Sequence, residues 1–270
     1  VELLGMTTKG DRWLNAPLSE VGGKGLFVKE LEVAMLEGRA DLAVHSVKDL
    51  PAQMPQGFCL PVLGFRSQVE DVLVSPRGDL SALPPGAKVG SSSLRRKSQL
   101  LAKRADLRVE PVRGNVGTRL AKLDSGEYDA IVLAAAGLRR LQIDRSDLHV
   151  LDTDTCLPAP GQGALGIECR EDAAVLALLE PLKDPEVARC VAAERGISAG
   201  LGADCSLPVA AHACLLQDGL IELRALLGSA DGSRILRSTQ RGRDPQTVAL
   251  QAVDELYRQG AEEVLAELRE

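Results

Sequence analysis

Six arginine residues lie near the junctions where predicted strands pass into predicted helices, or in the early turns of those helices. Arg95 and Arg96 follow the serine-rich turn GSSS, and Arg113 precedes the glycine turn GNVG. Such turns meet at one edge of a parallel sheet, so guanidinium groups there converge and match the fork of a carboxylate or phosphate. Any one arginine alone is more typical of solvated surface charge, but the set predicts a polyanionic ligand without identifying it. The set is Arg95, Arg96, Arg113, Arg119, Arg139 and Arg140.

A second polar group follows the buried strand predicted over 41–47 (DLAVHSV). Ser46, Lys48 and Asp49 come at its carboxyl end, beside His45, which we interpret as a structural histidine. A carboxylate in a partly dry site accepts N–H donors, stabilises developing positive charge and moves protons. Asp49 is therefore a candidate catalytic group, with a helix N-cap before Leu50 as the structural alternative.

One cysteine, Cys205, lies in the small, polar, turn-like segment LGADCSLPVA. A loop thiol is accessible, and its thiolate is a strong nucleophile. The nearest histidine, His212, is predicted on the next strand, which gives poor support to a Cys–His hydrolase. A covalent attachment point, a nucleophile and a plain free thiol all remain open from the residues alone.

The composition excludes several kinds of partner. The 270 residues are 45% hydrophobic, 26% charged and only 2% aromatic, with a formal net charge of −6. We therefore expect neither a nucleic-acid binder nor an anionic-membrane binder. No run of roughly twenty apolar residues predicts a membrane span, and no export signal is recognisable. The six dispersed cysteines lack metal-ligand spacing, so we expect no metal, and free thiols are typical of a cytoplasmic protein.

Alternating strand and helix patterns predict an α/β fold with a largely parallel sheet and helices on both faces. The first region combines a strand over 1–6 with a helix over 25–40, and the glycine-rich segment 22–25 between them is expected to form a mobile loop. Gln162, in the proline- and glycine-rich segment LPAPGQG, is a hinge candidate by composition. After residue 205 the pattern changes to an antiparallel meander and two helices, which predicts a smaller α+β region.

Several long motifs, in order along the chain, resemble the porphobilinogen deaminase (hydroxymethylbilane synthase) family of bacterial type. They are VGGKGLFVKELE, DLAVHSVKDLP, GSSSLRRKSQL, VRGNVGTRLAKLDSGEYDAIVLAAAGLRRL, LPAPGQGALGIECR and the Cys205 loop. The resemblance implies a transferase of porphyrin and heme biosynthesis. Such an enzyme joins four porphobilinogen molecules head to tail, releases ammonia at each addition and forms the linear tetrapyrrole hydroxymethylbilane.

The resemblance also implies roles for individual residues. The family's dipyrromethane cofactor is bonded through a thioether to the position of Cys205, and its catalytic aspartate matches Asp49. The positions that bind the cofactor match Lys48, Asp49, Ser93, Arg95, Arg96 and Arg119. The positions that bind substrate match Ser46, Arg113, Arg119, Arg140, Lys24 and Asp11, with Lys24 in the mobile loop.

The family's fold implies two lobes like those of type II periplasmic binding proteins and a smaller third domain with a three-stranded antiparallel sheet. We expect domain 1 over 1–64 plus 164–181, domain 2 over 69–158, and the cofactor-bearing domain 3 over 185–270. A further N-terminal strand and helix of the family is missing from the sequence, so we expect additional residues before Val1. Nothing in the residues demands a partner chain, so a monomer is expected. A non-catalytic, two-lobed polycarboxylate-binding module is the alternative.

Overall fold

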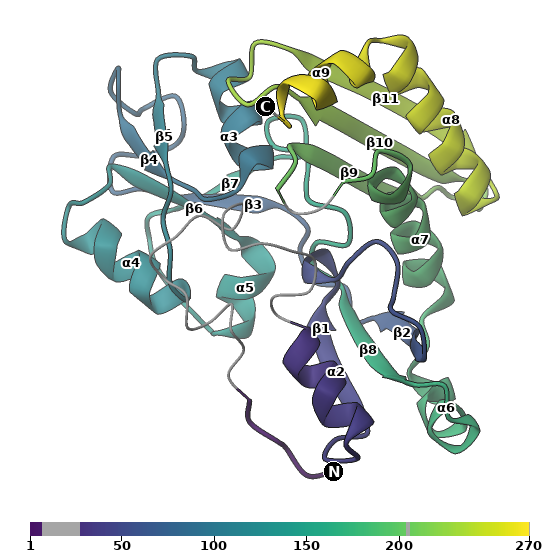
Figure 1. Cartoon of the computed structure of the whole chain (residues 1–270). Helices are drawn as coiled ribbons and strands as arrows, with labels where there is room; N and C mark the ends of the chain where they lie inside the picture. The colour runs from purple at the N-terminus through teal and green to yellow at the C-terminus, as the bar shows by residue number, and fades with distance from the viewer. Residues whose placement is uncertain (7–27, 204–205, 270) are drawn as a thin grey trace.

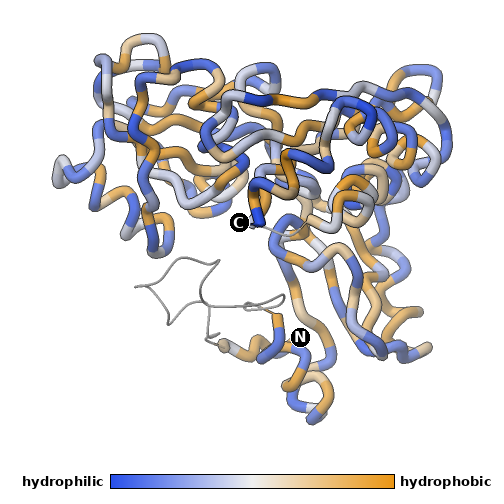
Figure 2. The backbone as a smooth tube through the Cα atoms, turned by 45° about the horizontal axis from the view of Figure 1, so that its top comes forward, coloured by the Kyte–Doolittle hydropathy of each residue, from blue (hydrophilic) through white to orange (hydrophobic). Residues whose placement is uncertain are grey.

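The computed structural model describes residues 1–6, 28–203 and 206–269, and in these ranges the chain forms three sheets (Figure 1). A three-stranded sheet lies at the bottom of the view, a five-stranded sheet at the left and a second three-stranded sheet at the upper right. Figure 2 shows hydrophobic and hydrophilic residues interspersed along the chain, as expected of helices that bury one face.

The first sheet combines segments that are far apart in the sequence. Its order is β1–β8–β2, and both neighbours pair with β8 in the antiparallel direction. The segment that we expected to return to the first lobe is therefore its central strand. Its elements are α2 (Lys29–Leu36), β1 (Leu42–Ser46), η1 (Val47–Asp49), β2 (Phe58–Gly64), β8 (Leu165–Arg170), α6 (Ala173–Leu179) and η2 (Glu180–Leu182).

The second sheet has the order β5–β4–β6–β3–β7 and apolar residues on both faces. In β3, Leu73 packs toward one cluster and its neighbours Val72 and Val74 toward another, because successive strand side chains point to opposite faces. Helix α3 covers the first face, and α4 and α5 cover the second. The elements are β3 (Asp71–Val74), β4 (Lys88–Gly90), α3 (Leu94–Lys103), β5 (Arg108–Glu110), α4 (Val116–Asp124), β6 (Ala130–Ala134), α5 (Ala135–Arg140) and β7 (Leu148–Leu151).

Two local expectations were wrong. The prediction of a largely parallel sheet misses β3, which pairs in the antiparallel direction with both β6 and β7. A short apolar strand buried on both faces has the same residue pattern in either direction, which explains the error. Residues 1–6, predicted as a strand, have no regular structure, because the apolar pattern alone does not supply a partner for backbone hydrogen bonds.

The C-terminal part of the chain confirms the predicted three-stranded antiparallel sheet, and the chain as a whole confirms the α/β fold class with a smaller α+β region. The C-terminal sheet has the order β11–β10–β9, and α7 and α8 pack on it around a common apolar core. Helix α7 ends five residues before Cys205. The elements are α7 (Pro185–Gly200), β9 (Val209–Leu215), β10 (Ile221–Gly228), β11 (Ile235–Gly242), α8 (Pro245–Arg258) and α9 (Ala261–Glu267).

Candidate active site

The candidate catalytic aspartate lies on a short turn that is fixed by the core beneath it. Val47 is buried, and its N–H donates to the carbonyl oxygen of Ala164 at 3.1 Å, which attaches the turn to the segment returning from the second sheet. Ser46, the last residue of β1, and Lys48 are half-buried, while Asp49 is exposed. The turn therefore anchors its apolar residue and leaves the Asp49 carboxylate accessible.

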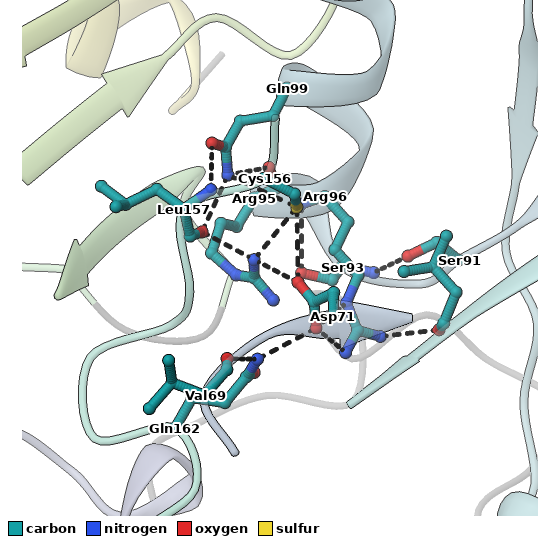
Figure 3. A network of polar contacts seen from close by, with 11 residues as sticks. Val69, Asp71, Ser91, Ser93, Arg95, Arg96, Gln99, Cys156, Leu157 and Gln162 are labelled. Atoms are coloured by element: carbon teal, nitrogen blue, oxygen red, sulfur yellow. Dashed lines mark hydrogen bonds and ion pairs between the residues drawn. The ribbon is translucent and has the colours of Figure 1, made fainter. Parts of the chain in front are cut away.

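Ser93, Arg95 and Arg96 occupy the start of α3. The Oγ of Ser93 accepts a hydrogen bond from the N–H of Arg96 at 3.4 Å, and this N-cap sets where the helix begins. Both arginine side chains are buried and turn toward Asp71, the first residue of β3 (Figure 3). The two arginine side chains therefore lie side by side and both contact Asp71, a residue that we did not identify from the sequence.

Asp71 accepts hydrogen bonds from both guanidinium groups. Arg95 Nη1 lies 2.7 Å from Oδ2, and Arg96 Nη2 lies 2.7 Å from Oδ1. Burial alone would raise the pKa of the Asp71 carboxyl, but the charges and hydrogen bonds of Arg95 and Arg96 hold it well below its ordinary value. The carboxylate is therefore ionised across the physiological range.

Arg113 lies in the turn between β5 and α4, and Arg119 lies near the start of α4. Gly114 in this turn has φ +109, and a Cβ there would lie 2.7 Å from Thr118, so the turn requires glycine. Its carbonyl oxygen accepts from Arg119 Nε at 2.7 Å. Burial lowers the pKa of Arg119, as do the nearby charges of Arg96 and Arg113, whereas Asp49 acts in the opposite direction.

Lys48 shares the same electrostatic surroundings. Burial lowers the pKa of its ammonium group, and the charges of Arg95 and Arg96 lower it further, while those of Asp49 and Asp71 raise it. Charged side chains from the first and second sheets therefore lie close enough to shift the pKa of Lys48 and of Arg119. We call Lys48, Asp49, Arg95, Arg96 and Arg119 the charge cluster.

Gln162 lies on one of the two segments that cross between the first and second sheets, and Arg140, at the end of α5, contacts that segment. Gln162 is fully buried, and its Nε2 donates to the Val69 carbonyl at 2.7 Å and to Asp71 Oδ1 at 3.0 Å. The next residue, Gly163, accepts from Arg140 Nη2 at 2.8 Å; its φ is +86, and a Cβ there would lie 2.7 Å from the backbone of Ser67. The crossing segments are therefore in direct contact, and Gln162 connects them.

Glu194, on α7, is a second buried carboxylate that we did not identify from the sequence. It accepts from Arg66 Nη2 at 2.8 Å and from the backbone N–H groups of Gly161 and Ala213, both at 2.7 Å. Burial raises the pKa of Glu194, and Arg66 and the two N–H groups oppose that rise. Arg66 and Gly161 belong to the two crossing segments and Ala213 to β9, so the Glu194 side chain connects both crossing segments to the C-terminal sheet.

Three predicted site residues, Cys205, Lys24 and Asp11, lie outside the described residues. Arg139 is exposed at the end of α5, and no contact ties it to the charge cluster within the described part of the chain. A charged residue at the edge of an apolar strand, as in DVLV, is the signal that points to Asp71. Within residues 1–6, 28–203 and 206–269, no helix is long and apolar enough to cross a membrane.

An α/β scaffold that gathers cationic side chains from two sheets around one exposed carboxylate defines a class: proteins that bind and process polyanionic small molecules. The chain belongs to the porphobilinogen deaminase family. The family model "Porphobilinogen deaminase, dipyromethane cofactor binding domain" matches residues 1–177, and that of the C-terminal domain matches residues 188–258.

The relatives include a curated porphobilinogen deaminase from Thiobacillus denitrificans. It is 52% identical over 269 residues, which cover 98% of this chain and 88% of that protein. Similar solved structures include a periplasmic binding protein from Salmonella typhimurium, 17% identical, with a TM-score of 0.35 over 59% of this chain and 74% of that one. A probable amino-acid ABC transporter extracellular-binding protein from Bacillus subtilis is 12% identical, with a TM-score of 0.38 over 60% of this chain and 73% of that one.

Proposed function

We propose that the charge cluster is the active site at which this chain joins four porphobilinogen molecules head to tail, with release of ammonia, to give hydroxymethylbilane. Membership of the family supports the reaction. One structural observation supports the site: a single segment contacts both the turn that carries Asp49 and the arginine pair. The Ala164 carbonyl in this segment accepts from the Val47 N–H at 3.1 Å, and its Gln162 Nε2 donates to Asp71, which binds Arg95 and Arg96. The reacting carbon of the substrate would then lie between the two lobes, beside the Asp49 carboxylate and the cations of the charge cluster.

The cations match the charges of the reactants. Each porphobilinogen unit has an acetate and a propionate group, so a chain of six rings brings about a dozen negative charges into the site. Guanidinium groups bind carboxylates through two parallel hydrogen bonds, whereas Lys48 acts as a point charge. This requirement explains a local group of cations in a protein whose formal net charge is −6.

Asp49 is the proposed catalytic residue. Loss of the aminomethyl nitrogen as ammonia leaves a cationic methylene-pyrrole, whose charge an adjacent carboxylate stabilises. The same carboxylate accepts a hydrogen bond from the pyrrole N–H and assists the proton transfers that let ammonia leave and the new C–C bond form. Because Asp49 is exposed on a fixed turn, each successive ring can approach the same group.

The dipyrromethane cofactor of the family fits the residues present. When bound, it supplies the terminal pyrrole to which the first substrate is added. Arg95 leaves Nε and Nη2 without a hydrogen bond to the described residues, so it retains donors for a ligand carboxylate. Cys205 is the proposed covalent attachment point. The residues proposed to hold the cofactor are Lys48, Asp49, Ser93, Arg95, Arg96 and Arg119; those proposed for incoming substrate are Ser46, Arg113, Arg119, Arg140, Lys24 and Asp11.

The proposal extends to the organisation of the protein. Domain 1 comprises 1–64 and 164–181, domain 2 comprises 69–158, and domain 3 comprises 185–270, with Gln162 at the hinge. The enzyme is a cytoplasmic monomer. Five free cysteines among the described residues agree with a reducing compartment. Sedimentation of the holoenzyme tests the monomer, and a dimer would contradict it.

Replacement of Asp49 tests the catalytic assignment. Asp49→Asn removes the charge from an exposed side chain, so it should lower kcat by about 10²- to 10⁴-fold with little change in Tm. Asp41→Asn, which changes an exposed aspartate in the same sheet region, is the matched control and should keep full activity. Wild-type turnover by Asp49→Asn would refute the assignment and favour a protein that only binds the ligand.

A further inference from the structure

Asp71 is the most highly coordinated carboxylate near the charge cluster, and it is fully buried. Its Oδ1 accepts from Arg96 Nε at 3.1 Å, Arg96 Nη2 at 2.7 Å and Gln162 Nε2 at 3.0 Å. Its Oδ2 accepts from Arg95 Nη1 at 2.7 Å and from the thiol of Cys156 at 3.3 Å. Five donors from four residues therefore converge on one side chain (Figure 3).

This coordination overcomes two tendencies of adjacent arginines. Consecutive residues of an α-helix point about 100° apart, so the side chains of Arg95 and Arg96 would diverge. Their like charges also repel each other, most strongly in a buried site. The Asp71 carboxylate between them binds both guanidinium groups, so it holds the side chains together and counteracts their repulsion. Because two guanidinium cations share one anion, the formal charge of the group falls from +2 to +1.

Among the described residues, these hydrogen bonds use all three nitrogens of Arg96 but only one nitrogen of Arg95. Arg96 is engaged at all three nitrogens, since its Nη1 also donates to the Val132 carbonyl at 2.8 Å. Arg95 uses only Nη1, which also donates to the Leu157 carbonyl at 2.8 Å, and its Nε and Nη2 make no hydrogen bond to the described residues. Nε and Nη2 form one edge of the guanidinium, the edge that takes a carboxylate in two parallel bonds.

We propose that Asp71 is a positioning residue, which holds Arg95 and Arg96 in place so that the Nε and Nη2 donors of Arg95 face a carboxylate of the pyrrole chain. The inference rests on the proposed function in one respect: the ligand is a carboxylate of the substrate or the cofactor. Through Gln162, the same carboxylate connects the arginines to the segment that crosses between the lobes. The anion-binding pair and the hinge candidate are thus held by one group.

Whether KM for porphobilinogen rises or falls in Asp71→Asn distinguishes two possible roles of Asp71: positioning the arginines, or only reducing their net positive charge. Asp71→Asn keeps the size of the side chain and raises the charge of the arginine group to +2. If Asp71 only reduced that charge, the variant would bind porphobilinogen more tightly and KM would fall. If Asp71 positions the arginines, KM rises despite the added positive charge, because the donors no longer share one fixed geometry.

The experiment compares the holoenzyme with Asp71→Asn, Asp71→Glu and the control Asp147→Asn, which breaks an ion pair with Arg145 elsewhere on the same sheet. We expect Asp71→Asn to raise KM for porphobilinogen at least tenfold and to lower the fraction of protein that has the cofactor mass. Asp147→Asn should leave both unchanged. A KM that stays the same or falls in Asp71→Asn overturns the inference.

Two further variants keep the test decisive. If Asp71→Asn does not fold, Asp71→Glu retains the charge but moves the carboxylate by one methylene, so KM should still rise; a wild-type KM overturns the inference. Arg95→Leu, measured in parallel, tests the proposed site itself. A normal KM in Arg95→Leu overturns both the proposed site and the positioning role of Asp71. A raised KM in Arg95→Leu together with a normal KM in Asp71→Asn overturns only the role of Asp71.

Discussion

Glu194, on α7, connects β9 to both segments that cross between the first and second sheets, and its replacement should cause a large loss of stability. The carboxylate is fully buried, and the side chain of its partner Arg66 is only 10% exposed. Removing one member of a buried ion pair leaves an uncompensated charge, which costs about 3–5 kcal/mol. Glu194→Gln also retains a single acceptor oxygen for the N–H groups of Gly161 and Ala213.

The expected loss is large enough to measure by thermal unfolding. At about 2–4 °C per kcal/mol for a chain of this size, Glu194→Gln should lower Tm by roughly 6–20 °C. Differential scanning calorimetry of the holoenzyme measures this shift. Glu222→Gln is the matched control: its partner Arg241 is exposed, so the surface pair contributes about 1 kcal/mol or less.

A double-mutant cycle with Arg66→Gln tests whether the ion pair between Glu194 and Arg66 causes the loss of stability. Since each single variant leaves the other charge buried and unpaired, the double variant should lose much less stability than the sum of the two. A double variant whose losses add within about 0.5 kcal/mol would show that the two side chains do not interact energetically. A Tm shift no larger than that of Glu222→Gln would equally refute the assignment.

Three more predictions concern charge. The lowered pKa of Lys48 means that its ammonium group deprotonates below the ordinary value of 10.5, so KM for porphobilinogen should rise at alkaline pH. Lys48→Arg should move that rise to higher pH, and an unchanged pH profile would count against Lys48 as a carboxylate ligand. Burial lowers the pKa of His212 to about 4 from an ordinary 6.5, so between these values only the unfolded state takes up the proton. Stability should therefore fall by up to about 3 kcal/mol as pH drops from 6.5 to 4, and an equal slope in His212→Asn would contradict this. Arg119→Leu removes a charge-assisted carboxylate contact worth about 1.5–3 kcal/mol, and an unchanged kcat/KM would exclude Arg119 from the site.

Local sequence patterns predicted the elements that present the charge cluster. The segments 87–104 and 107–141 each begin with a pattern of strand, polar or glycine turn and helix, and the structure contains β4 with α3 and β5 with α4. Caps at Ser93 and Asn115 explain why both helices begin there. The residues that form turns and helix caps are close together in the sequence, so these features can be predicted from a single sequence.

Long-range partners were not predictable in the same way. Asp71 lies 24 and 25 residues from the arginines and 91 residues from Gln162, and Glu194 lies 128 residues from Arg66. No periodicity connects positions so far apart, because their proximity depends on how the sheets pack together. The sequence therefore located the arginines, but the carboxylate between them required the structure.

If this chain builds a tetrapyrrole on a cofactor bonded to Cys205, the intact purified protein must contain that cofactor, and its mass will show whether it does. We predict a mass above that of the polypeptide by a dipyrrole unit, and a Cys205→Ser variant that has the polypeptide mass and no longer forms hydroxymethylbilane. An active enzyme with an unmodified Cys205 would contradict the account.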